Sequence, residues 1–129
     1  MRQKKKQPIG QNTLTPTVFY LLLALSGEEL HGYELMKKVT IDSGGAMEMG
    51  PGTLYGSIKR MLKQGLIEEV GERADSVLGD ERRRYYRATD AGRVALTMEL
   101  RRFAQALNVA GGRRLVRSAT VKRVKPATL

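Results

Sequence analysis

The stretch GPGTLYGSIKRMLKQGLIEEV, residues 50–70, predicts a helix followed by a strand, and it decides the fold. Four apolar residues recur at positions i, i+4, i+7 and i+8, so they lie on one stripe of the helix and face a core. They are Leu54, Ile58, Met61 and Leu62. The opposite, solvent-facing side carries two glycines and three cations: Gly52, Gly56, Lys59, Arg60 and Lys63. Gly65 is typical of a helix end, and LIEEV behind it is typical of a strand.

The exposed side of this helix has the profile of a DNA recognition helix, because an α-helix fits the major groove and cations attract phosphate. Each glycine costs about 1 kcal/mol of helix stability relative to alanine, but it removes a side chain where backbone comes near phosphate. Taken alone, three cations on an exposed helix face are equally compatible with simple solvation. The elements around the helix have to decide between the two interpretations.

Two more helices are expected before it. The first begins at Thr15-Pro16 and buries the apolar residues 18–25. The second opens in HGYELMKKV, residues 31–39, whose apolar side chains share one face. Lys37 and Lys38 turn away from that face, which places them on the surface.

A second strand is expected at RRYYRAT, residues 83–89, and the polar, glycine-containing segment 71–81 between the strands predicts a hairpin. Three helices followed by a hairpin is the order of a winged helix, whose wing reaches phosphate or the minor groove beside the recognition helix. Three arginines lead into the second strand: Arg82, Arg83 and Arg84. The loop itself contains Asp75, Asp80 and Glu81, which phosphate would repel.

A last helix begins at Thr89 or Asp90, carries on to Asn108 and ends at Gly111-Gly112. Its apolar residues form two nearly opposite stripes. One stripe contains Leu96, Leu100, Phe103 and Leu107, and the other contains Ala91, Val94 and Met98. Because one stripe packs on its own domain, the other most simply packs on a second copy of the chain. This predicts a homodimer.

The 129-residue chain carries a formal charge of +10, and its two ends hold the whole excess. Four basic residues lie before Gln11 and six lie after Gly112, whereas the charges between them cancel. Polycationic ends suit a loose, salt-sensitive attraction to nucleic acid or acidic lipid, although solvated arms that aid solubility are an alternative. A specific function therefore has to come from the arrangement of charge in the neutral middle.

Residues for catalysis or metal binding are scarce. The chain has no cysteine, and its one histidine, His31, is expected to cap or pack the second helix rather than bind a ligand. The acidic pairs at 28–29 and 68–69 do not converge, and phosphate-cradling loops are absent. The apolar run 18–25 is too short to span a bilayer, and residues 1–10 lack a secretory signal. We therefore expect no enzyme, metal, cofactor or membrane partner, and a cytoplasmic protein.

Three motifs together resemble the PadR family of bacterial transcriptional regulators: HGYEL at residues 31–35, GPGTLYGSIKRMLKQGLIE at 50–68 and RRYYRATDAG at 83–92. The resemblance covers roughly residues 14–107. It implies a winged helix-turn-helix with a C-terminal dimerisation helix, which binds an operator as a homodimer and usually represses. In that family the third helix brings the tyrosine of TLY and its polar neighbours to DNA, which here means Thr53, Tyr55, Ser57, Lys59 and Arg60.

The chain departs from the family pattern in three places. Its wing has GDERRR, residues 79–84, where family members often have a basic Gly-Arg-Pro turn, and Ala88 stands where they often have leucine. Some short members bind planar hydrophobic compounds between tryptophans at the dimer interface, and this chain has no tryptophan. Both a small-molecule effector of another kind and an effector-free regulator therefore stay open.

The expected fold class is mainly α with a small β-hairpin, a winged helix-turn-helix plus a C-terminal dimerisation helix. The chain divides into a basic arm at 1–12, a DNA-binding domain at 13–89, a dimerisation helix at 90–110 and a basic tail at 111–129. The expected DNA-binding residues are Lys37, Lys38, Thr53, Tyr55, Ser57, Lys59, Arg60, Lys63, Arg82, Arg83 and Arg84. The expected dimer residues are Val94, Leu96, Met98, Leu100, Phe103 and Leu107.

The expected function is a sequence-specific DNA-binding repressor that acts as a homodimer on a palindromic operator. Two alternatives keep the same fold. In one, the exposed face of the third helix contacts a protein partner. In the other, the basic ends make the chain a general nucleic-acid binder.

Overall fold

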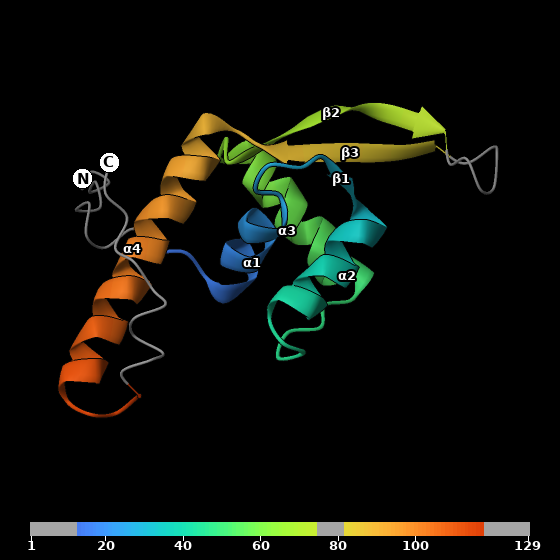
Figure 1. Cartoon of the computed structure of the whole chain (residues 1–129). Helices are drawn as coiled ribbons and strands as arrows, with labels where there is room; N and C mark the ends of the chain where they lie inside the picture. The colour runs from blue at the N-terminus through green and yellow to red at the C-terminus, as the bar shows by residue number, and fades with distance from the viewer. Residues whose placement is uncertain (1–12, 75–81, 118–129) are drawn as a thin grey trace, which may run out of the picture.

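The computed structural model describes residues 13–74 and 82–117, which form four helices and a three-stranded sheet. Their order is α1 (Pro16–Ala24), β1 (Leu30–His31), α2 (Gly32–Asp42), α3 (Pro51–Lys63), β2 (Ile67–Ala74), β3 (Arg82–Ala88) and α4 (Asp90–Gly112). In Figure 1 the long β2–β3 ribbon lies along one edge of the group formed by α1, α2 and α3. Helix α4 leaves the end of that ribbon and runs down the side of the molecule (Figure 1). The expected mainly α winged-helix architecture is confirmed.

Helix α1 occupies the centre of the core. It begins as the sequence predicts, because the Thr15 hydroxyl accepts a hydrogen bond from the Val18 amide at 3.2 Å and Pro16 fills the first helical position. Its Leu21 and Leu22 are almost completely buried. They pack with apolar residues of the other helices and of the sheet: Leu35, Val39, Leu54, Ile58, Met61, Ile67 and Tyr86.

The sheet has one strand more than the predicted hairpin. Its order is β1-β3-β2, all antiparallel, with Leu30 opposite Tyr86 and His31 opposite Tyr85. A strand of two residues shows no alternation of apolar and polar side chains, so the sequence pattern does not reveal it. The ribbon also contains an irregularity between Glu69 and Gly71, where Gly71 has a φ of 120°.

His31 holds the start of α2, as predicted. Its Nδ1 accepts a hydrogen bond from the Glu34 amide at 3.4 Å, and the Glu34 carboxylate accepts one from the His31 amide at 3.2 Å. This reciprocal arrangement is a capping box. The His31 ring also meets the Tyr85 ring edge-on at 5.3 Å, which ties α2 to the sheet.

Helix α3 buries most of the predicted stripe, with Leu54, Ile58 and Met61 at most 3% exposed. Leu62 is 36% exposed, so its assignment to the core was wrong. At about 100° per residue, Ser57 and Leu62 lie at opposite edges of the arc that Leu54, Ile58 and Met61 span, and the fold covers only the Ser57 edge. The helix ends at Lys63, and Gly65 follows with a φ of 77°, as its predicted role at the helix end requires.

Helix α4 is docked on the start of β2. The Thr89 hydroxyl caps it by accepting from the Gly92 amide at 3.1 Å and donates to the Gly65 carbonyl at 2.6 Å. Gly92 has no room for a side chain, since an added Cβ would overlap the Leu66 carbonyl oxygen and lie 3.1 Å from Leu22 Cδ2. The helix runs to Gly112, at the Gly111-Gly112 end that the sequence predicts.

Leu96 of α4 is 6% exposed and belongs to the core of its own domain, so its assignment to the dimer interface was wrong. The sequence showed two apolar stripes but did not show which part of each stripe the domain covers. No helix in residues 13–74 or 82–117 is long and apolar enough to cross a membrane.

Candidate nucleic-acid interface

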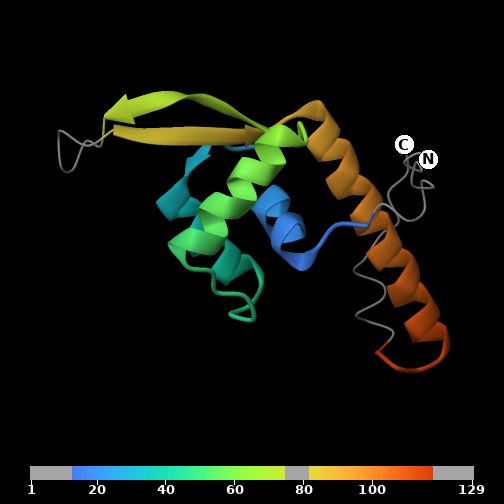
Figure 2. The same ribbon diagram turned by 180° about the vertical axis from the view of Figure 1, so that it is seen from behind.

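The exposed face of α3 is the centre of the candidate interface. In Figure 2 the helix crosses the front of the molecule below the β2–β3 ribbon. Five of the predicted DNA-binding residues on it are exposed: Thr53, Tyr55, Lys59, Arg60 and Lys63. Within the described part of the chain, none of its three cations has an acidic partner at salt-bridge distance. This face therefore presents uncompensated positive charge.

Ser57 does not belong to this face. Its side chain is completely buried, and its hydroxyl accepts a hydrogen bond from Arg60 Nη2 at 3.3 Å. The prediction that Ser57 approaches DNA was therefore wrong. Its position on the helix, beside Met61 on the buried arc, accounts for the difference.

The glycines at the start of α3 are not needed for packing within the chain. An added Cβ at Gly50 or Gly52 would meet nothing within 4 Å. At Gly56 it would lie 3.7 Å from Arg60 Nη1, an ordinary contact. Alanine would fit at Gly52 and Gly56 and favour the helix, so a requirement for glycine there has to come from outside the chain.

Helix α2 extends the cationic surface with Lys37 but not with Lys38. Lys38 forms an ion pair with Glu28, which neutralises its charge locally. The ammonium group of Lys37 lies 5.2 Å from the centre of the exposed Tyr33 ring, and no carboxylate in residues 13–74 or 82–117 is at salt-bridge distance from it. Tyr33 was not predicted, although its position opposite Leu35 on the helix indicated exposure.

The arginines of the β2–β3 ribbon are mostly paired with carboxylates. Arg84 Nε lies 3.5 Å from Glu72 and 3.8 Å from Glu69, so this predicted DNA-binding residue already has anionic partners. Arg83 is half-buried and also interacts within the chain. The side chain of Arg82 lies outside the described residues, as do Asp75, Asp80, Glu81, the N-terminal arm and the tail from residue 118 onward. Three cations of the basic tail, Arg113, Arg114 and Arg117, are described and exposed.

A network centred on Glu29 joins the ribbon to the loop before β1. Arg73 hydrogen-bonds to Glu29 and stacks on the Tyr85 ring at 4.0 Å. Arg87 donates to Glu68 at 2.7 Å and lies 3.5 Å from Glu29. The hydrogen bond from Arg73 lowers the pKa of the Glu29 carboxyl, and the hydrogen bond to Glu68 raises the pKa of Arg87. We call Glu29, Glu68, Glu69, Glu72, Arg73, Arg84 and Arg87 the ribbon network.

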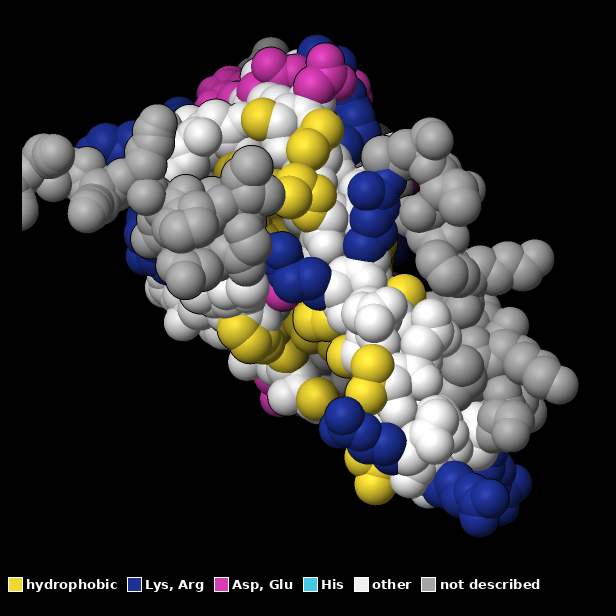
Figure 3. Space-filling view, turned by 90° about the vertical axis from the view of Figure 1, so that its left-hand side faces the viewer, with side chains coloured by type: hydrophobic (Ala, Val, Ile, Leu, Met, Phe, Trp, Pro, Cys, Tyr) yellow, Lys and Arg dark blue, Asp and Glu magenta, His cyan; other side chains and the backbone are white. Residues whose placement is uncertain are grey.

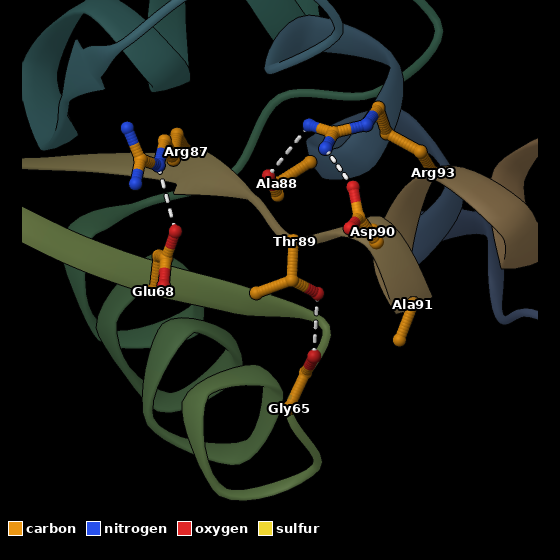
Figure 4. Close-up of a pocket in the computed structure, with 8 residues that line it drawn as sticks. All are labelled: Gly65, Glu68, Arg87, Ala88, Thr89, Asp90, Ala91 and Arg93. Carbon is orange, nitrogen blue, oxygen red and sulfur yellow. Dashed lines mark hydrogen bonds and ion pairs between the residues drawn. The ribbon is translucent and has the colours of Figure 1, made fainter.

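A shallow pocket lies where the ribbon meets α4, and Figure 4 shows its lining residues. They are Gly65, Glu68, Arg87, Ala88, Thr89, Asp90, Ala91 and Arg93. Arg93 donates to the Ala88 carbonyl at 3.0 Å and pairs with Asp90, while Arg87 pairs with Glu68. Each charged group of the lining is thus already paired with another group of the chain. The pocket is therefore better explained as part of the contact between the ribbon and α4 than as a ligand site.

Helix α4 exposes a second kind of surface. Figure 3 shows hydrophobic side chains gathered along the face on which α4 lies, with lysine or arginine side chains between them. The exposed apolar residues of α4 include Val94 at 59%, Leu100 at 40% and Phe103 at 48%. Phe103 also contacts Phe19 of α1, with ring centres 5.0 Å apart, and Met98 and Leu107 are half-buried.

Comparison with known proteins identifies the family. Residues 21–98 match the model of the transcriptional regulator PadR-like family. The transcriptional regulator Rv3488 of Mycobacterium tuberculosis is 36% identical over 94 residues, which cover 72% of this chain and 81% of that protein.

Solved structures agree with this assignment. A PadR-like transcriptional regulator from Bacillus cereus has a TM-score of 0.61 and 27% identity, covering 74% of this chain and 88% of that one. Bacillus subtilis PadR, solved in complex with operator DNA, has a TM-score of 0.54 and 20% identity, covering 62% of this chain and 44% of that one. The chain therefore belongs to the PadR-like family, and it is a transcriptional regulator rather than an enzyme.

Proposed function

We propose that this regulator is a repressor that binds a palindromic operator as a homodimer, with one α3 helix for each half-site. The observation that carries the proposal is the uncompensated charge of Lys59, Arg60 and Lys63 on a helix whose opposite side is buried. Such a helix enters the major groove without disturbing the core. Bacillus subtilis PadR, a protein of the same fold, binds operator DNA, which supports this use of the fold.

Three more residues belong to the proposed DNA-binding surface. Thr53 and Tyr55 on α3 supply groups that hydrogen-bond or contact bases, and Lys37 on α2 supplies a cation for the backbone of the DNA. In this proposal Lys38 and Arg84 contribute little, because carboxylates of the chain already neutralise them. The proposed DNA-binding surface therefore uses only some of the basic residues in the sequence.

The dimer of the proposal is joined through α4. Its exposed apolar side chains, Val94, Leu100 and Phe103, give a second copy a surface to bury, with Met98 and Leu107 beside them. Leu100→Glu and Val94→Glu test the two stripes separately by sedimentation at several protein concentrations. We expect at least one to yield a folded monomer. Two folded dimers of wild-type strength would contradict the use of α4.

Selection of bound sequences from random double-stranded DNA tests the function itself. We expect enrichment of a palindrome whose half-sites are about 10 base pairs apart or a multiple of that distance. A selection that enriches no sequence would contradict specific recognition. Enrichment of a single, asymmetric site would keep DNA binding but contradict the symmetric dimer. Repression is tested separately, by transcription from a promoter that carries the selected sequence.

The contribution of the basic ends to DNA binding has to be separated from that of α3. Removal of residues 1–10 and 113–129 takes away the whole charge excess. We expect the shortened protein to bind more weakly and with a flatter salt dependence, because fewer phosphate contacts release fewer counterions. Its sequence preference should persist in competition with random DNA. Loss of all preference would favour the general nucleic-acid binder.

A further inference from the structure

The side chain of Tyr55 occupies the space where a residue other than glycine at position 32 would have its Cβ. A Cβ added to Gly32 would overlap the Tyr55 hydroxyl oxygen and would lie 2.9 Å from Cζ and 3.2 Å from Cε1 of the same ring. Gly32 is the first residue of α2, and Tyr55 lies in α3. The phenol therefore packs directly against the backbone of the neighbouring helix.

The backbone at Gly32 is also held by the residues that begin α2. His31 and Glu34 form the capping box around it, and the His31 ring meets Tyr85 of β3. The φ of Gly32 is not in the left-handed region, so the backbone itself accepts any residue there. The ring of Tyr55 is consequently what a side chain at position 32 would displace.

Tyr55 combines this contact with exposure to solvent. Half of its surface is exposed, and it lies one turn of α3 before Lys59, on the same side of the helix. An exposed tyrosine normally exchanges between rotamers, and a side chain that must meet DNA in one orientation loses affinity through that freedom. Packing against Gly32 restricts the ring before DNA arrives.

From this geometry we infer that Gly32 is a positioning residue for DNA recognition, which holds the Tyr55 phenol in its binding orientation by leaving room for it. The inference rests on the proposed function, because it concerns how the same surface binds DNA. It adds to that surface a residue that does not reach DNA itself.

Gly32→Ala is the direct test. The atom it displaces is the far end of a side chain with open solvent beside it, so the ring can swing away and the fold should survive. We expect thermal unfolding close to that of the wild type and about a tenfold weaker affinity for the selected operator. Gly112→Ala is the matched control, since an added Cβ at the end of α4 would meet nothing within 4 Å.

A double-mutant cycle separates positioning from other effects. In a Tyr55→Ala background there is no ring to displace, so Gly32→Ala should then leave affinity unchanged. An equal loss in both backgrounds would overturn the inference, and so would wild-type affinity in the single variant. A Gly32→Ala protein that fails to fold would overturn it as well, because the inference requires a ring that moves at low cost.

Fluorine NMR of protein labelled with 3-fluorotyrosine gives a readout that needs no DNA. The Tyr55 resonance, assigned with Tyr55→Phe, should shift in Gly32→Ala while that of Tyr20 in α1 stays in place. An unchanged Tyr55 resonance would exclude the contact. If the wild type selects no DNA sequence but the resonance shifts, the proposed function fails while the contact between Gly32 and Tyr55 stands.

Discussion

Two surfaces of this molecule are rich in lysine or arginine, and they differ in what surrounds the cations. On α3, Lys59, Arg60 and Lys63 face solvent without a carboxylate partner in the described part of the chain. On the β2–β3 ribbon, Arg73, Arg84 and Arg87 are each paired with glutamate. The difference shows that a count of basic residues does not locate a cationic surface. The neighbours set by the fold decide which charges remain available to an anion.

The most direct test of this difference removes two cations from each surface and compares the losses of operator affinity. Lys59→Ala with Arg60→Ala should weaken operator binding by about a hundredfold, because each lost contact to a base or phosphate costs about 1–3 kcal/mol. Thermal unfolding and dimerisation should not change, since both side chains lie away from the core. Titration of labelled operator, with melting and sedimentation of the same samples, checks all three expectations. Normal operator binding by the folded double variant would contradict the assignment of α3 as the DNA-contacting helix.

Replacement of Gly52, on the same face of α3, should change stability and operator affinity in opposite directions. Gly52→Ala should raise the free energy of unfolding by up to about 1 kcal/mol, because alanine favours a helix and has free space there. We expect operator affinity to fall by about tenfold, since the added methyl group lies where backbone approaches phosphate. Urea unfolding and operator titration measure the two quantities. A variant that is more stable and binds as well as the wild type would show that DNA does not approach Gly52.

The ribbon provides the matched loss of charge. Arg73→Ala with Arg87→Ala removes two positive charges, as many as the α3 double variant. These two arginines are paired with Glu29 and Glu68. We expect operator affinity to change by less than about threefold, because Glu29 and Glu68 hold these guanidinium groups away from phosphate contacts. What remains is the long-range effect of the lost charge, which salt screens. The midpoint of thermal unfolding should fall, since the ribbon loses its connection to Glu29. An affinity loss equal to that of the α3 variant would mean that total charge matters and placement does not.

The smallest expected effect concerns pH and the ribbon network. The pKa of Glu29 lies below its ordinary value because Arg73 hydrogen-bonds to the carboxylate, so its contribution to stability is present above the unfolded pKa. That contribution is lost as the pH falls from the ordinary glutamate pKa, about 4.3, through the lower folded pKa. Melting curves across this range should show a shallower loss for Glu29→Gln than for the wild type. Glu48→Gln, an exposed carboxylate without a salt bridge in residues 13–74 and 82–117, is the control and should follow the wild type.

Much of α3 is predictable from sequence because its signal is local. The spacing of Leu54, Ile58 and Met61 requires one buried face, and Gly65 supplies the left-handed residue that ends the helix. The two errors on this helix, Ser57 and Leu62, lie where the buried face ends. There a wheel gives an angle, but only the neighbouring helix and sheet determine what is covered.

The ribbon network was not predictable, because it depends on register. Arg84 faces Glu72 only because the irregularity at Gly71 shifts the pairing of β2 against β3. Neither the length of the loop nor the composition of the strands specifies that shift. The contact between Gly32 and Tyr55 is equally hidden, since it joins residues of two helices without any shared sequence pattern.

The docking of α4 has a consequence for the spacing of DNA sites. Thr89 and Gly92 fix the first turn of α4 against the backbone of residues 65–66, where no side chain fits between them. In a dimer joined through α4, this rigid attachment sets the separation and relative rotation of the two α3 helices. The bases that are read and the number of base pairs between them are then controlled by different residues. Changes near Gly92 would alter the accepted spacing and leave the preferred half-site the same.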